Sequence, residues 1–245
     1  NDGDMDAIYG SGDSDDELVW LRRDSDGSFA GMLIYSADNI RAVYAADLDS
    51  DGDMDIISAS EGDDKLKWAE HISINANGSI NYTTHTIATG LNDPMALNVN
   101  DLDADGDLDI LLGTQGDDKI IFYESDGAAD PSFSATTITS SADGIYSVYA
   151  KDMDNDGDLD ILSASANDDK IAWYESNGAA DPSFTARTIA TSADGAASVF
   201  AADLDGDGDQ DVISASLDDN TVAWYENGLS AFGSHSFTAA DIATS

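Results

Sequence analysis

The sequence predicts an all-β fold built from repeated four-stranded sheets, and three observations carry this prediction. One sequence pattern returns along the whole chain of 245 residues. Each copy contains short segments rich in β-branched and aromatic residues, bounded by Gly, Asn, Asp or Ser, which is typical of strands and turns. No segment shows the apolar period of about 3.6 residues that an amphipathic helix requires. Four strands per repeat favour a β-propeller with one sheet per blade over a β-solenoid, whose coils are far shorter.

An acidic segment anchors each repeat. Residues 47–55 read Asp-Leu-Asp-Ser-Asp-Gly-Asp-Met-Asp, and the pattern starts again at Asp101, Asp152 and Asp203, with spacings of 54, 51 and 51 residues. A shortened copy, residues 2–6, opens the chain. We therefore predict a single propeller, or a fragment of one, over residues 1–245. Its repeats are approximately 1–38, 39–92, 93–143, 144–194 and 195–245.

The first two strands of a repeat flank the acidic segment. Residues 42–45 (Ala-Val-Tyr-Ala) form strand A before it, and residues 56–60 (Ile-Ile-Ser-Ala-Ser) form strand B after it. An Asp-Asp turn follows, as at Asp63 and Asp64. The acidic segment is therefore expected to be the loop that joins strands A and B.

Strands C and D complete the repeat. Strand C is typified by residues 170–174 (Lys-Ile-Ala-Trp-Tyr), in which neither face is plainly polar, as expected for a strand packed between neighbouring sheets. A Gly turn often follows, and strand D is typified by residues 184–189 (Phe-Thr-Ala-Arg-Thr-Ile). We predict such turns at Asp126-Gly127, Asn177-Gly178 and Asn227-Gly228.

Strand C carries an aromatic residue at one fixed position. The residues at this position are Trp20, Trp68, Phe122, Trp173 and Trp224. We expect them to pack one blade against the next. The alternative is that they line sugar-binding sites between blades, because aromatic faces suit the apolar faces of sugar rings.

The chain contains B-C-D and then four complete A-B-C-D sets, which predicts 19 strands, or about five blades with the first incomplete. The strand absent from the first blade is the innermost strand A, whose position would leave backbone groups unpaired. We therefore expect a piece of a larger propeller, or a subunit whose ring is completed by another segment or another copy.

The acidic loop has the chemistry of a calcium site. Several carboxylates within nine residues repel one another unless a cation joins them or some take up protons. Asp at positions 1, 3 and 5 converges on one point, Gly at position 6 allows a sharp turn, and Asp at position 9 is able to close the shell, by the logic of an EF-hand loop. An all-oxygen ligand set selects calcium over zinc or copper, and magnesium resists the dehydration required. The alternative is a solvated Asp-rich turn that binds nothing.

The pattern Asp-x-Asp-x-Asp-Gly-x-x-Asp followed by Ile-Ile-Ser-Ala-Ser resembles the FG-GAP/VCBS repeats of bacterial secreted proteins and of integrin alpha-subunit propellers. The resemblance covers essentially the whole chain, although the Phe-Gly and Gly-Ala-Pro signatures are mostly reduced to Val-Tyr and Ser-Ala-Ser. It implies four complete calcium sites, with the position-7 residue acting through its carbonyl, and a fifth partial site at the first loop, where positions 1 and 3 are absent. The implied ligands are Asp47, Asp49, Asp51, Asp53 and Asp55; Asp101, Asp103, Asp105, Asp107 and Asp109; Asp152, Asp154, Asp156, Asp158 and Asp160; Asp203, Asp205, Asp207, Asp209 and Asp211; and, in the partial loop, Asp2, Asp4 and Asp6.

Composition excludes several classes of function. The formal net charge of −41 repels nucleic acid and anionic lipid, and no apolar run reaches the roughly 20 residues of a membrane-spanning helix. There is no Cys, and so no disulfide or thiolate site. The three histidines, His71, His85 and His235, fall in different parts of the repeat, with His85 in a D strand and His235 in the turn before one. No nucleophile motif lies nearby, so we expect no catalytic site.

These features together predict a non-catalytic, calcium-binding module of a secreted or cell-surface protein, used for adhesion or ligand recognition. A protein or carbohydrate ligand is expected on the rim opposite the calcium loops. Two alternatives stay open: a carbohydrate-binding accessory domain of a secreted polysaccharide-degrading enzyme, and a structural subunit of an extracellular filament or matrix. Extracellular modules bind calcium at about 10⁻⁴–10⁻³ M, which suits a calcium-rich compartment.

Overall fold

The computed structural model describes residues 5–12, 16–74, 80–229 and 235–244. Within these ranges the chain forms strands β1 to β19, and no helix of a length or apolarity that could cross a membrane occurs among them. The strands are β1 (Ala7–Gly10), β2 (Glu17–Arg23), β3 (Phe29–Ser36), β4 (Ile40–Ala46), β5 (Asp55–Ser60), β6 (Lys65–Ile74), β7 (Ile80–Thr89), β8 (Pro94–Asn100), β9 (Asp109–Thr114), β10 (Lys119–Ser125), β11 (Phe133–Thr139), β12 (Ile145–Lys151), β13 (Asp160–Ser165), β14 (Lys170–Ser176), β15 (Phe184–Ala190), β16 (Ala196–Ala202), β17 (Asp211–Ser216), β18 (Thr221–Leu229) and β19 (His235–Thr244).

The strands form five antiparallel meanders in chain order. The first sheet has three strands, β1-β2-β3, and the other four are β4-β5-β6-β7, β8-β9-β10-β11, β12-β13-β14-β15 and β16-β17-β18-β19. The prediction of four-stranded blades with an incomplete first blade is therefore confirmed. The residue pairing also has the same phase in each sheet, because Ile8 pairs with Trp20 in the first as Ile57 pairs with Trp68 in the second.

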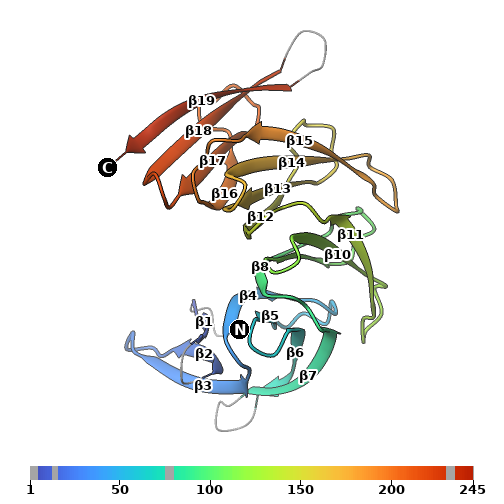
Figure 1. Ribbon diagram of the computed structural model, residues 1–245. Helices are drawn as coiled ribbons and strands as arrows, with labels where there is room; N and C mark the ends of the chain where they lie inside the picture. The colour runs from blue at the N-terminus through green and yellow to red at the C-terminus, as the bar shows by residue number, and fades with distance from the viewer. Residues whose placement is uncertain (1–4, 13–15, 75–79, 230–234, 245) are drawn as a thin grey trace.

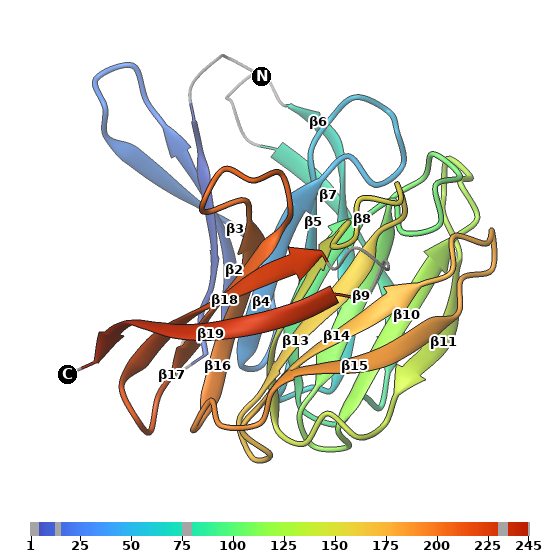
Figure 2. The same ribbon diagram turned by 90° about the horizontal axis from the view of Figure 1, so that it is seen from above.

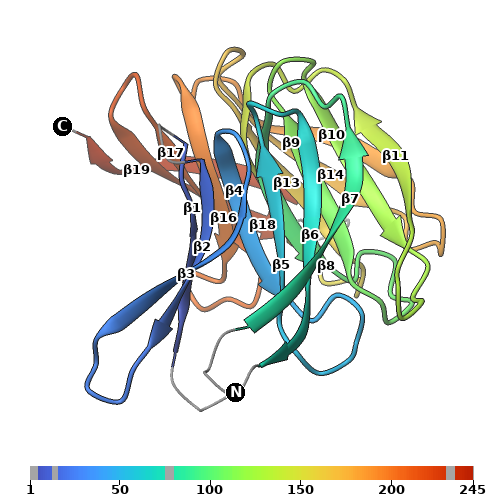
Figure 3. The ribbon, with the colours of Figure 1, turned by 90° about the horizontal axis from the view of Figure 1, so that it is seen from below.

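The sheets follow one another along an open arc, with the first and the last sheet at its two ends (Figure 1). The first strands of the complete sheets, β4, β8, β12 and β16, contact one another in succession and form the inner side of this arc. Strands of successive sheets run alongside each other, so that connecting loops gather at the two ends of the sheets (Figures 2 and 3). The A–B loops lie at one end, and the B–C and D–A turns lie at the other.

The core lies between neighbouring sheets. In one cluster, Trp68 and Leu66 of β6 pack with Val99 of β8 and Leu112 of β9. Trp68 and Trp173 are each 1% exposed, and the ring of Trp68 also stacks on His85 of the adjacent strand at 4.5 Å between centroids. Side chains at the aromatic position are thus buried in the first four sheets, which supports the packing interpretation and leaves those rings without a free face for a sugar. Trp224, in the last sheet, is half-buried.

Two details of the sequence prediction are wrong. The turn expected at Asn227-Gly228 does not form, because β18 continues through both residues, which pair with Phe237 and Ser236. His235, expected in the turn before a D strand, is the first residue of β19. The last sheet therefore has longer outer strands than the two sheets before it, in which residues 126–127 and 177–178 lie outside strands as predicted.

Candidate metal centres

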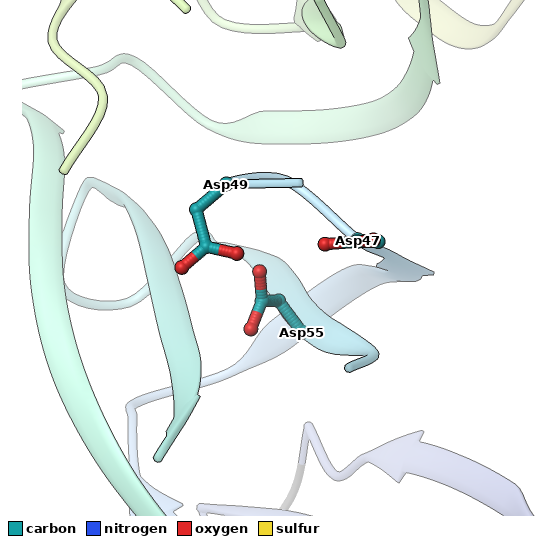
Figure 4. Close-up of side chains that lie close together, drawn as sticks. All are labelled: Asp47, Asp49 and Asp55. Atoms are coloured by element: carbon teal, nitrogen blue, oxygen red, sulfur yellow. The ribbon is translucent and has the colours of Figure 1, made fainter. Parts of the chain in front are cut away.

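The A–B loop of each complete sheet brings three carboxylates together. In the second sheet these are Asp47 and Asp49, from the loop that follows β4, and Asp55, the first residue of β5. They occupy positions 1, 3 and 9 of the loop, and one carboxylate oxygen from each lies within 4.8 Å of the others (Figure 4). The same geometry recurs in the three later sheets. Its members there are Asp101, Asp103 and Asp109; Asp152, Asp154 and Asp160; and Asp203, Asp205 and Asp211.

The loop backbone explains how nine residues achieve this convergence. Positions 4 and 6 both have left-handed backbone, with φ of 60° at Ser50 and 97° at Gly52. The Gly52 N–H donates to Oδ2 of Asp47 at 3.0 Å, and the Asp51 N–H donates to Oδ1 of Asp49 at 3.1 Å. These bonds fix the first two carboxylates and turn the chain back toward Asp55.

The position-9 aspartate joins the loop to the sheet. Asp55 is 1% exposed; its Oδ2 accepts the Leu48 N–H at 3.0 Å, and its Oδ1 accepts the His71 N–H from β6 at 2.8 Å. This side chain therefore ties together position 2 of its own loop and a C strand 16 residues later in sequence. The equivalent acid accepts the equivalent C-strand N–H in the other four sheets: Arg23 to Asp6, Ser125 to Asp109, Ser176 to Asp160 and Asn227 to Asp211.

Burial without a counter-charge makes these carboxyl groups harder to ionise. Desolvation raises the pKa of Asp55 to about 6 and the pKa values of Asp109 and Asp160 to about 7, against an ordinary value of 3.8, although their backbone hydrogen bonds act in the opposite direction. The pKa of Asp103 at position 3 is also raised, first by desolvation and then by neighbouring aspartates. The protein alone therefore does not compensate the negative charge of this site.

Position 1 supplies a further sign of an incomplete polar environment. Oδ1 of Asp47 and Oδ1 of Asp152 are shielded from solvent and have no hydrogen-bond partner within the described ranges. A buried carboxylate oxygen without a partner costs free energy of the order of 1–3 kcal/mol or more. A cation at the centre of the cluster would supply the missing partner.

The carboxylates of positions 5 and 7 are not members of the triads, although position 5 stays beside position 3, because Asp105 helps to raise the pKa of Asp103 and Asp156 that of Asp154. Oδ1 of Asp51 accepts the Asp53 N–H at 2.8 Å, and the Asp53 carboxylate lies 3.6 Å from Nδ1 of His71. The position-7 side chains of Asp107 and Asp158 lie against the turns at Gly127 and Gly178. A position-7 side chain that points away leaves only its carbonyl for a ligand, which is the role that the family resemblance implies for it.

The first loop gathers no cluster among the described residues. Asp2 and Asp4 lie outside them. Asp6 has the structural contacts of a position-9 acid, because its Oδ1 accepts the Arg23 N–H at 2.8 Å and its Oδ2 accepts the Trp20 indole N–H at 3.1 Å.

Sequence reasoning missed the bond between position 9 and strand C. Its signal was present, because the donor residue always follows the aromatic position by three residues, as His71 follows Trp68. A fixed spacing does not by itself reveal a backbone contact between segments that are distant in the sequence.

Within the described ranges the histidines contact carboxylates and an amide. Nε2 of His85 lies 2.8 Å from Glu70, and Nδ1 of His235 lies 2.9 Å from Oδ1 of Asn227. None of the three histidines hydrogen bonds a Ser or Thr hydroxyl in this part of the chain. The described histidines therefore offer no activated hydroxyl nucleophile.

Several solved structures are similar to this chain. A lectin from Agrocybe aegerita, described as recognising non-reducing terminal N-acetylglucosamine, has a TM-score of 0.58 and 17% identity over 96% of this chain and 65% of its own. The V. cholerae biofilm matrix protein Bap1 has a TM-score of 0.57 and 19% identity over 96% of this chain and 35% of its own. The periplasmic gluconolactonase PpgL of Pseudomonas aeruginosa has a TM-score of 0.65 and 13% identity over 97% of this chain and 65% of its own. These identities establish likeness of fold alone, and the chain spans less than two thirds of each of these proteins.

No curated protein sequence matches the chain. The model of the FG-GAP-like repeat, in contrast, matches four overlapping segments, residues 1–58, 47–112, 101–163 and 152–214. Each match covers two successive acidic loops and ends within the B strand that follows the second loop. The chain therefore belongs to the FG-GAP-like repeat family.

Proposed function

We propose that this chain is a non-catalytic β-propeller module that binds about four calcium ions and acts in adhesion or ligand recognition outside the cell. The observation that carries the proposal is the fourfold repetition of one carboxylate triad in which the position-9 acid is buried. Calcium prefers such oxygen ligands and accepts additional carbonyl and water oxygens, which suits the position-7 carbonyl.

The ions are proposed to be structural. Position 9 already holds the loop to strand C, and a cation would compensate its charge and those of positions 1 and 3 where burial raises their cost. Four calcium ions, each with two positive charges, would change the net charge from −41 to −33. The ligand of the module is proposed to be a protein or carbohydrate that meets the opposite rim, made by the B–C and D–A turns.

Calcium counting tests the proposal most directly. We expect isothermal titration of the calcium-stripped protein to find about four sites, and thermal unfolding to show a higher Tm with calcium than without it. Asp154→Asn removes a gathered position-3 ligand and is expected to lower the count by one. Asp158→Asn is the matched control, since its side chain lies outside the cluster, and it is expected to keep four.

The contrary results are equally specific. A stripped protein that neither binds calcium nor changes its Tm would make the loops solvated turns. An Asp158→Asn variant that loses a site while Asp154→Asn keeps it would reverse the ligand assignment. A screen of the calcium-loaded protein on sugar and protein arrays then addresses the ligand, with concentration-dependent polymerisation as the sign of a filament-forming role.

A further inference from the structure

A cavity of about 200 Å³ lies between the fourth and the fifth sheet, at the rim opposite the acidic loops. Its walls come from the end of β15 and the turn after it on one side, and from β17, β18 and β19 on the other. The polar lining includes Asp219, Asp241, Ser216, Thr221 and Tyr225.

The rest of the lining is aliphatic and small. Ile189, Ala190 and Ala193 come from the fourth sheet and its turn, and Ala223 and Ala239 come from the fifth. Such walls suit a short hydrocarbon chain, whereas Asp219 and Asp241 suit a positive charge at its end.

Comparison with the other repeats explains why this cavity exists. In three sheets the aspartate equivalent to Asp219 binds a lysine two residues later. Lys65 Nζ lies 2.9 Å from Asp63, Lys170 Nζ lies 3.1 Å from Asp168, and Lys119 pairs with Asp117 in the same way. The fifth sheet has Thr221 at the lysine position.

The fifth sheet also has an additional aspartate, Asp241, beside this cavity. Ala172 of β14 pairs with Thr188, whereas the equivalent Ala223 of β18 pairs with Asp241. Relative to the fourth sheet, one ammonium group has been removed and one carboxylate has been added. No Lys, Arg or His of the described chain forms an ion pair with Asp219 or Asp241.

Two buried hydroxyl groups complete the polar side of the cavity. Tyr225 is 4% exposed and Ser216 is 6% exposed, and the Tyr225 hydroxyl lies 3.3 Å from Oγ of Ser214. The pKa of Tyr225 is raised, first by burial and further by the charges of Asp219 and Asp241, so both carboxylates act on the hydroxyl at the cavity wall. Hydroxyl oxygens and carboxylates together accept hydrogen bonds from an ammonium group, which has three donors and no acceptor.

We propose that this cavity binds a primary ammonium group carried on a short alkyl chain, as in a lysine side chain, at the place where the other repeats hold a lysine of their own. Asp219 and Asp241 would pair with the ammonium, and the alanines and Ile189 would contact the hydrocarbon chain. The inference deepens the recognition role proposed above by naming a ligand class for the rim opposite the calcium loops.

n-Butylammonium is the probe for the first test, with n-butanol as the neutral control of similar shape. Titration of the calcium-loaded protein, followed by NMR chemical shifts, is expected to show one site for the amine, with changes confined to residues around Tyr225, and none for the alcohol. Such a small ligand is expected to bind with Kd on the order of 1 mM. Equal binding of amine and alcohol, or amine shifts spread over the acidic surface, would overturn the proposal.

Thr221→Lys is the decisive variant, because it restores the lysine of the other repeats. We expect it to pair with Asp219, to raise the Tm and to weaken butylammonium binding by at least about tenfold. Asp219→Asn should weaken binding without filling the cavity and provides the second variant if the first does not fold. Unchanged amine affinity in both variants would contradict the assignment.

The fourth sheet provides a gain-of-function control. Lys170→Thr combined with Thr188→Asp transfers the two differences of the fifth sheet, and we expect it to create a second amine site.

The capped lysine Nα-acetyl-lysine methylamide should bind as butylammonium does, whereas tighter binding of glucosamine than of either would overturn the assignment to an alkyl chain. Calcium is counted on the same sample. A protein that binds calcium but no amine overturns only this inference, and one that binds the amine but no calcium overturns only the proposed calcium role.

Discussion

Asp109 and Asp160 have a structural role that is independent of any ion, because each holds two backbone N–H groups from different parts of its sheet. For Asp160 the donors are Met153 at 3.0 Å and Ser176 at 2.7 Å. Hydrogen bonds to a charged acceptor contribute about 1.5–3 kcal/mol each, but complete burial of the carboxylate opposes this gain. This balance explains why the pKa of Asp160 is raised to about 7 although both of its carboxylate oxygens accept hydrogen bonds.

The calcium-free protein is therefore expected to lose stability as the pH rises. Asp109 and Asp160 have pKa values of about 7 in the folded protein, against an ordinary value of 3.8. Between these two pH values the folded state therefore binds more protons than the unfolded state. Their contribution to the free energy of unfolding is fully present below about pH 4 and is lost as the pH rises through about 7. Urea unfolding of calcium-stripped protein at pH 5.5 and pH 8 measures this, and the higher stability is expected at pH 5.5.

Two controls separate these groups from general charge repulsion. In the double variant Asp109→Asn, Asp160→Asn the difference between the two pH values should shrink, because the titrating groups are gone. In saturating calcium the fall between pH 5.5 and pH 8 should also shrink, because protons and calcium compete for the same oxygens. A pH dependence that is identical in the variant and in the wild type would show that these two carboxyls do not cause it.

At the scale of the element, the acidic loop depends on left-handed backbone at two positions. Position 4 is occupied by Ser50, Ala104, Asn155 and Gly206 in the four sheets, with φ between 60° and 82°. A left-handed conformation costs a residue with a Cβ about 1–2 kcal/mol, and alanine has no side-chain oxygen with which to offset that cost locally. Ala104 thus retains strain that the fold of the loop has to overcome.

Replacing Ala104 is therefore expected to stabilise the protein. Ala104→Gly relieves the left-handed strain but adds chain entropy to the unfolded state, which leaves a net gain of about 0.5–1 kcal/mol. Gly106→Ala in the same loop is the opposite test, since its φ is 102° and a Cβ there would meet no atom within 4 Å. Its cost, about 1–3 kcal/mol, would arise from the backbone alone. Urea unfolding in saturating calcium measures both, and a destabilising Ala104→Gly would show that the strain is already relieved.

At the scale of the whole molecule, charge repulsion opposes the folded state. The net charge is −41 in 245 residues, and only 9 lysines and arginines are available to pair with 50 acids. Lys65 and Lys67, for example, pair with Asp63, and among the described residues no lysine or arginine forms an ion pair with the four complete acidic loops. The loops at one rim therefore rely on screening or on bound cations.

Monovalent salt is expected to stabilise the calcium-free protein. The Debye length falls from about 30 Å at 0.01 M to about 8 Å at 0.15 M, which screens repulsion between neighbouring loops. We expect a gain of about 1–2 kcal/mol over this range, or a rise in Tm of at least about 2 °C in differential scanning calorimetry. The rise should be smaller with calcium bound, and a Tm that falls with salt would show that local ion pairs outweigh the net repulsion.

Most of the fold could be predicted from the sequence because its information is local. Strand order, the A–B position of the acidic loop and the burial of the aromatic position follow from a repeated pattern of residue types, and one repeat confirms another. The exceptions, Asn227 and Gly228, are instructive. Their dipeptide is typical of a turn, but pairing with Phe237 and Ser236 of β19 overrides this local preference.

The candidate sites divide in the same way. Positions 1 and 3 are close in sequence, so their convergence with position 9 was predictable from loop geometry alone. The sequence could not distinguish these carboxylates from position 5, which is not a member of the triads although it is only two residues from position 3.

By itself, the sequence determined the repeat, the strands and the acidic loops, because each depends on contacts within a few residues. Only the tertiary structure decided which atoms meet across longer separations. It joined Asp55 to His71, 16 residues away, and it placed Asp219 and Asp241 around one cavity that the fourth sheet closes from the other side. The physical reason is that hydrogen bonds and cavities depend on distances between strands and sheets, and residue types at fixed spacing do not specify those distances.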